Sequence, residues 1–436
     1  MNIEEIYSIY LNNPVICTDT RNITKGCIFC ALKGDNFNGN QFAAKALENG
    51  AAYAVIDEPD YGTNTPYILV TNVLQTLQEL ATYHRSQLKI PFIGITGTNG
   101  KTTTKELLNS VLSQHYKTYA TKGNLNNHIG VPLTILSITN EIEVAIIEMG
   151  ANHPGEIDFL CQIAQPSHGL ITNVGKAHLE GFGGFEGVKR TKGELYKYLA
   201  THQGIVFINQ DNHFLIEMAE NHHVSNAIEY GTASTCYVSG SIFNTNPFLS
   251  VNWKPRNDEF DKHDYKASTN LTGIYNFENV LAAIVVGYFL QLSPDEINRG
   301  IENYKPANNR SQITTTDKNT LICDYYNANP SSVLVSLENL ESIPAINKVL
   351  ILGDMFELGQ EAAAEHSAIV KKAESIPLAK RIFIGSEFYK LRNSTGFFYE
   401  STSEAYEALK NDPVVNATVL IKGSRGMKLE NLVELL

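Results

Sequence analysis

The chain has 436 residues, of which 43% are hydrophobic and 18% charged, and its formal net charge at pH 7 is −12. This length predicts about two to four domains, and the acidic balance argues against general nucleic-acid binding, which needs a basic surface. The N-terminus lacks the pattern of a secretion signal, and the longest apolar run, Val280 to Leu290, is too short for a membrane span of ~20 residues. We therefore expect a cytoplasmic protein without membrane insertion and without a nucleic-acid partner.

Residues 1–85 form the first predicted domain, in which short β-rich runs alternate with helical patterns. Strands are expected in IFCAL, AAYAVID and YILV, and helices in NQFAAKALENG and VLQTLQELATYHRSQ. Cys27 and Cys30, in the segment CIFC, could indicate redox or zinc chemistry. The sequence offers no second cysteine pair to complete a metal site, so we interpret both as small apolar core residues.

Residues 86–308 form the second predicted domain, which opens with a phosphate-binding pattern in IPFIGITGTNGKTTTKELLNSVL. An apolar strand, a glycine-rich turn and an amphipathic helix follow one another, and Gly97, Gly100, Lys101 and Thr102 give G-x-x-G-K-T, which is similar to a P-loop. In such a loop the glycines let backbone N–H groups close around phosphate, the lysine reaches the terminal phosphates, and the threonine hydroxyl can bind magnesium. Ile95 stands where the standard motif has its first glycine. A structural glycine turn is the alternative, and the strand–turn–helix setting favours nucleotide binding.

Polar residues follow further predicted strands of this domain. Strands are expected in VAIIEMG, GLITNVG and GIVFIN, with an antiparallel excursion in STCYVSGSIFNTNPFLSVNW and a buried helix in NFENVLAAIVVGYFL. Glu148 ends one strand and His178 follows another, and functional groups of open α/β sheets lie beyond the carboxyl ends of strands. Beside a P-loop threonine they could ligate magnesium. The alternatives are a helix-capping Glu148 and an ordinary loop histidine, and Lys192 alone would be a solvated helix lysine.

Residues 309–436 form the third predicted domain, after a linker in NYKPANN. Strands in TLICDY, KVLILGD, RIFIG and TVLIKG alternate with helices in PSSVLVSLENL, EAAAEHSAIVKKAES and SEAYEALKN, which argues for a second parallel α/β sheet. The predicted fold class is therefore α/β.

Long motifs in this order resemble the Mur ligase family: GITGTNGKTTTKELL, TKGNLNNHIGVPLTIL, IIEMGANHPGEI, ITNVGKAHLEGFGGFEGVKRTKGELY, DYYNANPSSV, ILGDMFELGQEAAAEH and LIKGSRGMKLENLV. The resemblance implies a small UDP-binding domain, a central P-loop ATPase domain with a mostly parallel sheet, and a C-terminal Rossmann-like domain. It also implies ATP and Mg²⁺ as cofactors, and ligation of D-alanyl-D-alanine to the terminal carboxylate of UDP-N-acetylmuramoyl-tripeptide in peptidoglycan precursor synthesis. ATP would first convert this carboxylate to an acyl phosphate, which the amine then attacks. We expect small-molecule substrates and a monomer.

The resemblance also assigns roles to individual residues. Thr102, Glu148 and His178 match the family's magnesium ligands, and Lys192 matches a lysine that is carbamylated in related enzymes; Lys101, Glu148, His178 and Lys192 are the expected catalytic set. The expected nucleotide contacts are Gly97, Thr98, Asn99, Gly100, Lys101, Thr102, Thr103, Asn276, Asn279, Arg310 and Asp324. The expected substrate contacts are Thr20, Arg21, Lys33, Asn126, Asn127, Asn327, Lys422 and Ser424. For each, capping or surface solvation is the alternative. The family often has histidine where this chain has Tyr275.

Two other classes of function compete with this hypothesis. A sibling ligase that adds diaminopimelate or lysine, or a folylpolyglutamate synthetase, shares the superfamily, but this chain has YNANP where diaminopimelate-adding enzymes carry D-N-P-R. A folate enzyme would lack the block ALKGDNFNG. A P-loop regulator or motor is the alternative from a different class, and the N-K-x-D signature of a GTPase is absent from the sequence.

Overall fold

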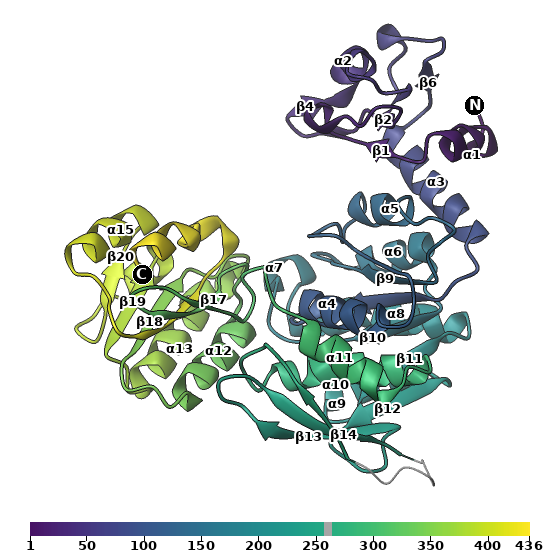
Figure 1. Cartoon of the computed structure of the whole chain (residues 1–436). Coiled ribbons are helices and arrows are strands. Elements are labelled where there is room, and N and C mark those ends of the chain that lie inside the picture. The colour runs from purple at the N-terminus through teal and green to yellow at the C-terminus, as the bar shows by residue number, and fades with distance from the viewer. Residues whose placement is uncertain (257–263) are drawn as a thin grey trace.

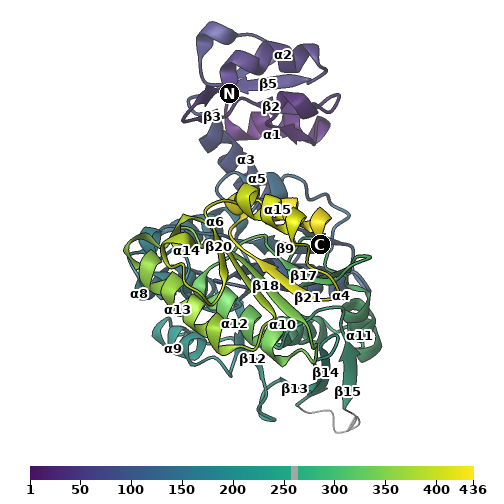
Figure 2. The ribbon, with the colours of Figure 1, turned by 90° about the vertical axis from the view of Figure 1, so that its left-hand side faces the viewer.

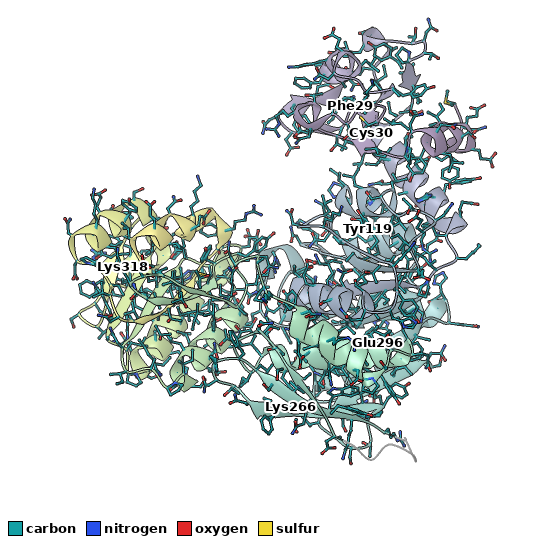
Figure 3. The ribbon with its side chains drawn as sticks, in the orientation of Figure 1. Phe29, Cys30, Tyr119, Lys266, Glu296 and Lys318 are labelled. Carbon is teal, nitrogen blue, oxygen red and sulfur yellow. The ribbon has the colours of Figure 1, made fainter. Side chains whose placement is uncertain are left out.

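The computed structural model describes residues 1–256 and 264–436, which fold into three α/β domains (Figure 1). The N-terminal domain projects from one end of the central domain, and the C-terminal domain lies beside the central domain. After a quarter turn, the C-terminal domain stands in front of the central one (Figure 2). Side chains fill the space between the elements of each domain (Figure 3).

The N-terminal domain is built on a parallel sheet of strand order β1-β2-β5-β6, covered by helices on both faces. Side chains of neighbouring strand residues point to opposite faces. Ile28 and Cys30 accordingly join the core below α1 and α3, whereas Phe29 packs with α2 on the other face. The elements are α1 (Ile3–Asn12), β1 (Ile16–Cys17), η1 (Thr20–Asn22), β2 (Ile28–Cys30), β3 (Lys33–Gly34), β4 (Phe37–Asn38), η2 (Gly39–Phe42), α2 (Ala43–Glu48), β5 (Tyr53–Ile56), η3 (Pro59–Tyr61) and β6 (Tyr67–Leu69).

Helix α3 (Val73–Gln87) connects the first two domains and has the bounds that the sequence predicted. It packs against α1 on one side and against α5 and α6 of the central domain on the other. The Tyr10 hydroxyl of α1 donates a 2.7 Å hydrogen bond to the carbonyl oxygen of Leu136, which ties the first helix to the central domain as well. The predicted domain boundary at residue 85 falls inside α3, and both predicted boundaries stay predictions.

The central domain holds a sheet of strand order β15-β14-β13-β12-β11-β10-β7-β9-β8, which is parallel from β8 through β13. Strands β13, β14 and β15 pair antiparallel, which confirms the predicted antiparallel excursion. The strands are β7 (Phe92–Thr96), β8 (Thr118–Ala120), β9 (Val144–Glu148), β10 (His168–Ile171), β11 (Ile205–Asn209), β12 (Ala227–Gly231), β13 (Val238–Asn244), β14 (Ser250–Pro255) and β15 (Tyr265–Ser268).

Both faces of this sheet are covered by helices, as the strongly apolar strands require. Helices α4 (Lys101–Leu112), α10 (Asn276–Phe289) and α11 (Pro294–Asn303) share one core with Val144 and Ile146 of β9. The other face packs Ala145 and Ile147 of the same strand against the remaining helices. These are α5 (Gly130–Ile135), α6 (Glu156–Ala164), α7 (Leu179–Phe182), α8 (Phe185–Thr201) and α9 (His213–Asn221).

The C-terminal domain has a sheet of strand order β16-β17-β21-β18-β19-β20, with helices on both faces. All neighbouring strands of this sheet pair parallel except β16 and β17, which pair antiparallel. The predicted parallel sheet is therefore confirmed, and the sequence did not predict its antiparallel edge strand β16. The strands are β16 (Gln312–Thr315), β17 (Thr320–Asp324), β18 (Lys348–Gly353), β19 (Lys380–Ile384), β20 (Phe397–Tyr399) and β21 (Thr418–Lys422). The helices are α12 (Pro330–Ser342), η4 (Gly359–Glu361), α13 (Ala362–Ser375), α14 (Ser386–Lys390), α15 (Thr402–Asn411), η5 (Arg425–Met427) and η6 (Leu429–Leu435).

Two smaller predictions can be compared with the fold directly. The six cysteines all lie within the described residues as buried free thiols, which confirms that Cys27 and Cys30 are core residues. The apolar run from Val280 to Leu290 lies mostly in the buried helix α10, as predicted. Among residues 1–256 and 264–436, the helices are too short or too polar for any of them to cross a membrane.

Candidate active site between the central and C-terminal domains

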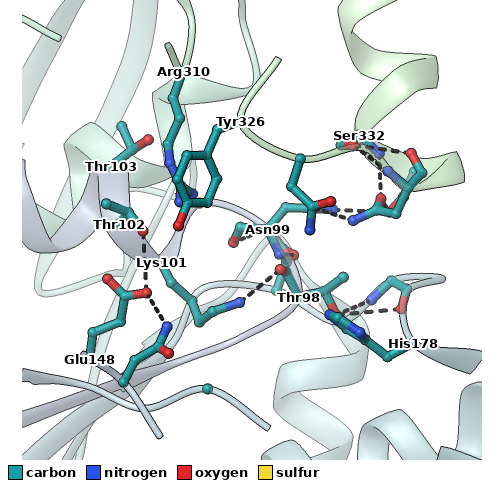
Figure 4. A pocket seen from close by; sticks show the side chains of 18 of the residues that line it. Thr98, Asn99, Lys101, Thr102, Thr103, Glu148, His178, Arg310, Tyr326 and Ser332 are labelled. Atoms are coloured by element: carbon teal, nitrogen blue, oxygen red, sulfur yellow. Dashed lines mark hydrogen bonds between the residues drawn. The ribbon is translucent and has the colours of Figure 1, made fainter. Parts of the chain in front are cut away.

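A cleft of about 680 Å³ lies between the central and C-terminal domains, at the carboxyl ends of β7, β9 and β17. Open α/β sheets place their ligand sites at such strand ends. Residues of both domains line it (Figure 4). Among the residues that the sequence predicted, those lining the cleft are Thr98, Asn99, Gly100, Lys101, Thr102, Thr103, Asn126, Asn127, Glu148, His178, Asn276, Asn279, Arg310, Asp324, Asn327 and Lys422.

The predicted P-loop connects β7 to α4, and its backbone has the conformation that its glycines allow. Gly97 has φ 143° and Gly100 has φ 79°, values that side chains other than glycine rarely adopt. A Cβ atom on Gly100 would lie 2.5 Å from the Oδ1 of Asn279, so the close approach also requires glycine. Helix α4 begins at Lys101 without a side-chain cap. Its first N–H groups and its positive end are therefore free to bind an anion.

Lys101 folds back over this loop. Its Nζ donates hydrogen bonds to the carbonyl oxygens of Gly97, at 2.7 Å, and Thr98, at 3.0 Å. Desolvation lowers the pKa of Lys101 to about 8; the carboxylate of Glu148 opposes this shift and the cation of Arg310 adds to it. The ammonium thus lies at the loop that would hold phosphate, near a second cation from the C-terminal domain.

Thr102 and Glu148 form a pair that fits a bound cation. The Thr102 hydroxyl donates to Oε1 of Glu148 at 3.2 Å, and the Asn126 amide donates to the same oxygen at 2.9 Å (Figure 4). The other carboxylate oxygen, Oε2, is buried and has no hydrogen-bond partner within residues 1–256 and 264–436, and it forms an ion pair with the buried ammonium of Lys105 at 3.8 Å. A buried carboxylate oxygen that accepts no hydrogen bond, beside a hydroxyl, is a suitable ligand set for Mg²⁺.

His178 and Lys192 are the other two predicted metal ligands. Figure 4 shows His178 across Thr98 from Glu148, and its Nδ1 contacts a carboxylate oxygen of Glu357 from the C-terminal domain. In the described parts of the chain, no three His, Cys, Asp or Glu residues are grouped so that they could hold a metal. The predicted metal set contains only two residues of these types, Glu148 and His178, so this absence does not test it and the set stays a prediction.

Lys192 is only 3% exposed, so the interpretation of this residue as a solvated helix lysine is wrong. Its Nζ lies 5.2 Å from the centre of the Phe182 ring. Desolvation, reinforced by the charge of Lys101, holds the pKa of Lys192 well below its ordinary value, although Glu194 and Glu156 oppose the shift. The sequence could not show this burial because the residue lies on the inner face of an otherwise charged helix.

Asn276 and Asn279, the predicted nucleotide contacts on α10, form an internal amide chain. The Thr104 hydroxyl of α4 donates to Oδ1 of Asn279, whose Nδ2 donates to Oδ1 of Asn276 at 2.9 Å. Asn276 in turn donates to the carbonyl oxygen of Thr272 at 2.8 Å. Both side chains are buried, and they join the start of α10 to the helix that follows the P-loop.

The C-terminal domain contributes an acidic and a basic group to the cleft. Lys422 donates to Oδ2 of Asp324 at 2.7 Å, and the Ser336 hydroxyl donates to the same oxygen at 3.0 Å. The guanidinium of Arg310 stacks on the ring of Tyr326 (Figure 4). Its Nε is buried and finds no hydrogen-bond partner in the part of the chain that the structure describes. Arg310 therefore presents a cation to the cleft without a bonded carboxylate.

The remaining predicted substrate residues have partners of their own. Asn127 accepts a hydrogen bond from the Gly130 N–H at 2.9 Å, and Asn327 accepts one from the Ala328 N–H. Ser424, outside the cleft lining, accepts from the Phe356 N–H.

Three predicted substrate residues lie in the N-terminal domain, apart from the cleft. Thr20 begins η1, and Arg21 pairs with Asp19 at 2.7 Å. Lys33 pairs with Asp57 and Glu58, each at 2.8 Å. Their roles in substrate binding stay predictions.

Several cleft residues were not predicted from the sequence. Tyr326, Asn329 and Ser331 follow β17, and Glu278 lies in the first turn of α10. The strand-end rule that selected Glu148 could have found Tyr326, and the sequence N-P-S-S could have indicated Asn329 as a helix cap. Phe159, 42% exposed, lies on the cleft wall and has no sequence signal that separates it from a core phenylalanine.

Comparison with known proteins agrees with this architecture. Three family models match in order: "Mur ligase family, catalytic domain" over residues 15–91, "Mur ligase middle domain" over residues 95–287, and "Mur ligase, glutamate ligase domain" over residues 309–425. A protein of Bacillus subtilis (strain 168) named UDP-N-acetylmuramoyl-tripeptide–D-alanyl-D-alanine ligase is 32% identical over 99% of this chain and 97% of its own. The chain belongs to the Mur ligase family.

Other Mur ligases support the same placement. A relative from Escherichia coli (strain K12) with the same name is 32% identical over 99% of this chain and 95% of its own. The crystal structure of MurF from Acinetobacter baumannii matches with a TM-score of 0.85 and 30% identity, covering 96% of this chain and 92% of that one. MurF ligase from Thermotoga maritima, in complex with ADP, shares the fold at 24% identity, with a TM-score of 0.84 and coverage of 98% and 97%.

Proposed function

We propose that this Mur ligase joins D-alanyl-D-alanine to the terminal carboxylate of UDP-N-acetylmuramoyl-tripeptide, with ATP as the energy source. The observation that carries the proposal is the composition of the cleft. The P-loop of the central domain lines one side of it, and Arg310 and Asp324 of the C-terminal domain line the other. The relatives that cover the whole chain carry the name of this activity.

The reaction needs a carboxylate to become a good acyl donor. The carboxylate oxygen attacks the γ-phosphorus of ATP, the bond between γ-phosphorus and ADP breaks, and an acyl phosphate forms. The neutral amine of D-alanyl-D-alanine then attacks the acyl carbon, and the tetrahedral intermediate expels phosphate to leave an amide. The proton that the amine loses leaves with phosphate or solvent. The products are the lengthened peptide, ADP and phosphate.

The residues of the cleft suit the first of these steps. Phosphoryl transfer brings several anionic oxygens together, so it is favoured by cations that are already in place. Lys101 supplies a cation at the P-loop, and Arg310 supplies a second one from the opposite domain. The stacking of Arg310 on Tyr326 limits the freedom of the guanidinium before substrate arrives.

A magnesium ion fits the pair of Thr102 and Glu148. Oε2 of Glu148, which accepts no hydrogen bond in the described residues, and the Thr102 hydroxyl would hold the ion, and the ion would neutralise charge on the phosphates of ATP. Asn126 orients the carboxylate through its other oxygen. His178 and a carbamylated Lys192 are proposed to complete metal binding once substrates displace the contact of His178 with Glu357.

Polar and aromatic residues of the cleft wall are proposed to receive the acceptor peptide and the dipeptide. Asn126, Asn127 and Phe159 line the part of the cleft that is formed by the central domain, and Asn327, Lys422 and Ser424 are proposed to act on the dipeptide side. Thr20, Arg21 and Lys33 of the N-terminal domain are proposed to bind the nucleotide sugar. We also propose that the enzyme acts as a monomer.

Coupled measurement of ADP release tests the proposal. ADP release should require both UDP-N-acetylmuramoyl-tripeptide and D-alanyl-D-alanine in the presence of MgATP. A P-loop motor or regulator would instead hydrolyse ATP without either substrate, and replacement of the dipeptide by lysine or diaminopimelate would identify a sibling ligase. Full ADP release without the dipeptide would contradict the proposal.

A further inference from the structure

Three side chains form a closed ring of hydrogen bonds between the P-loop and the C-terminal domain. Nδ2 of Asn99 donates to Oγ of Ser331 at 3.0 Å, and Oγ of Ser331 donates to Oδ1 of Asn329 at 2.9 Å. Nδ2 of Asn329 then donates to Oδ1 of Asn99 at 2.8 Å, which closes the ring. In such a chain each group donates and accepts, so the hydrogen bonds polarise and strengthen one another.

On the central side, the ring is anchored through the backbone of Asn99. Its N–H donates to Oδ1 of Asn173 at 3.0 Å, and its carbonyl oxygen accepts from the Thr172 hydroxyl at 2.6 Å. Both partners follow β10. The P-loop backbone is therefore fixed by its own domain, whereas the Asn99 side chain is directed to the other domain (Figure 4).

On the C-terminal side, the ring is anchored at the start of α12. Oδ1 of Asn329 accepts from the Ser332 N–H at 2.9 Å and thereby caps the helix. Ser331 also packs closely on the central domain, because a Cβ atom on Gly175 would lie 2.8 Å from the Ser331 Oγ. A shift of α12 by even one or two ångströms would break the ring, since hydrogen bonds weaken steeply beyond about 3.2 Å.

We propose that Asn99, Asn329 and Ser331 are positioning residues that couple the nucleotide-binding loop to docking of the C-terminal domain. The ring exists only while the two domains are in contact, and its central-domain member stands between Gly97 and Lys101 of the P-loop. Asn99 was predicted as a nucleotide contact. In this structure its side chain instead forms hydrogen bonds with the C-terminal domain: Nδ2 donates to Ser331, and Oδ1 accepts from Asn329. This inference rests on the nucleotide binding in the proposed function and not on the ligation itself.

Coupling of this kind acts in both directions. If the docked state has the P-loop geometry that binds nucleotide best, then docking raises nucleotide affinity and nucleotide favours docking by the same factor. Arg310 reaches the cleft from the C-terminal side, so only the docked state offers both cations to the phosphates. Loss of the ring should therefore weaken nucleotide binding even where the altered residue lies in the C-terminal domain.

Three variants separate this role from direct nucleotide contact. Ser331→Ala removes one ring member, and Asn329→Ser keeps a helix cap but is too short to reach Asn99. Asn99→Ala removes the P-loop member. Asn339→Ala is the matched control: Asn339, on the same helix, donates to the Thr272 hydroxyl of the central domain at 3.2 Å and is not a member of the ring.

The measurements are the Kd for MgADP by calorimetry and the MgADP-dependent change in radius of gyration by X-ray scattering, on the full chain. Asn329→Ser and Ser331→Ala should each raise the Kd about 5-fold and reduce the compaction, within the usual range for coupled sites. The double variant Asn99→Ala with Asn329→Ser should be no weaker than Asn99→Ala alone. Asn339→Ala should bind MgADP like the unaltered chain.

Three results would overturn the inference. Unaltered MgADP affinity in Asn329→Ser and Ser331→Ala would show that the ring does not act on the P-loop. Equal weakening by Asn339→Ala would show a general effect of domain contact. Additive losses in the double variant would show that Asn99 binds nucleotide independently of the ring. If the chain binds MgADP with this coupling but ligates no dipeptide, the proposed function fails while the inference stands.

Discussion

The guanidinium carbon of Arg310 lies 3.8 Å from the centre of the Tyr326 ring. Arg425 approaches the same ring at 5.2 Å, so the aromatic face is shared by two cations. Tyr326 follows β17 and Arg310 precedes β16, and these two strands pair antiparallel. The pairing of edge strand β16 with β17 in the C-terminal domain therefore positions the Arg310 guanidinium beside Tyr326 at the cleft.

The first prediction concerns this stacking. Tyr326→Leu should lower the rate of ADP release about 10-fold with saturating substrates, because a desolvated cation–π contact contributes up to about 2 kcal/mol and each 1.4 kcal/mol is a factor of ten. Tyr326→Phe keeps the ring and should stay near the unaltered rate. Steady-state ADP release measures both. Equal losses in the two variants would show that the hydroxyl, and not the ring, matters.

The second prediction concerns the P-loop lysine. Lys101→Met should reduce ADP release by about 10²- to 10³-fold, which is the usual loss when a preorganised group at a developing charge is removed. The control is Lys117→Met, which removes an exposed lysine of the same domain that pairs with Glu141 at 3.6 Å. Near-normal turnover of the Lys101 variant would refute its role at the phosphates.

The third prediction concerns the buried lysine of α8. Burial lowers the pKa of Lys192, which favours the neutral form of the amine, the form that can add carbon dioxide to give a carbamate. Lys192→Ala should lose activity and regain part of it when a short-chain carboxylic acid such as acetate is titrated into the assay. Lys189→Ala, on the same helix, removes a lysine that pairs with Glu217 at 3.0 Å and should neither lose activity nor respond to acetate. Normal activity of Lys192→Ala without added acid would exclude the carbamate role.

The fourth prediction concerns the carboxyl group of Glu278 on the cleft wall. Burial, with a smaller contribution from Asp211, raises the pKa of Glu278 to about 7 from its ordinary value of 4.5. The folded chain thus disfavours the ionised form, and this group reduces stability progressively as the pH rises from 4.5 to 7. Glu278→Gln should therefore raise the free energy of unfolding, relative to the unaltered chain, by about 2 kcal/mol more at pH 8 than at pH 5.

Urea unfolding at the two pH values measures this difference. An equal effect of Glu278→Gln at pH 5 and pH 8 would show that the carboxyl group titrates normally in the folded chain. Glu229→Gln, a substitution at a carboxylate of the neighbouring strand β12 with partial exposure, serves as the control.

Local patterns in the sequence predicted much of the fold. The spacing of apolar residues in α3 predicted the bounds of that helix. The long strands of the central and C-terminal domains were predicted because a sheet that is buried on both faces requires strands of nearly continuous apolar residues. Strand β16, Gln312–Thr315, was missed because it is short and polar, and as an edge strand it is only partly covered. Strand β20 and helix α14 are too short for a periodic pattern.

The site was predicted less completely, for a physical reason. The P-loop and Glu148 follow from local motifs and strand ends. The contact of His178 with Glu357 and the ring that joins Asn99 to Asn329 depend on how two domains meet, over sequence separations that no local pattern encodes. The burial of Lys192 likewise depends on the partners of α8, because the helix itself carries charges on both sides of that residue.

The transfer of oxygen from acceptor to phosphate tests the central claim most directly. The acceptor UDP-N-acetylmuramoyl-tripeptide is labelled with ¹⁸O in its terminal carboxylate and incubated with the enzyme, MgATP and D-alanyl-D-alanine. Activation through an acyl phosphate predicts that each phosphate released carries one ¹⁸O atom, together with one equivalent of lengthened peptide. Lengthened peptide with unlabelled phosphate would contradict carboxylate activation, and labelled or unlabelled phosphate without lengthened peptide would contradict the ligase itself.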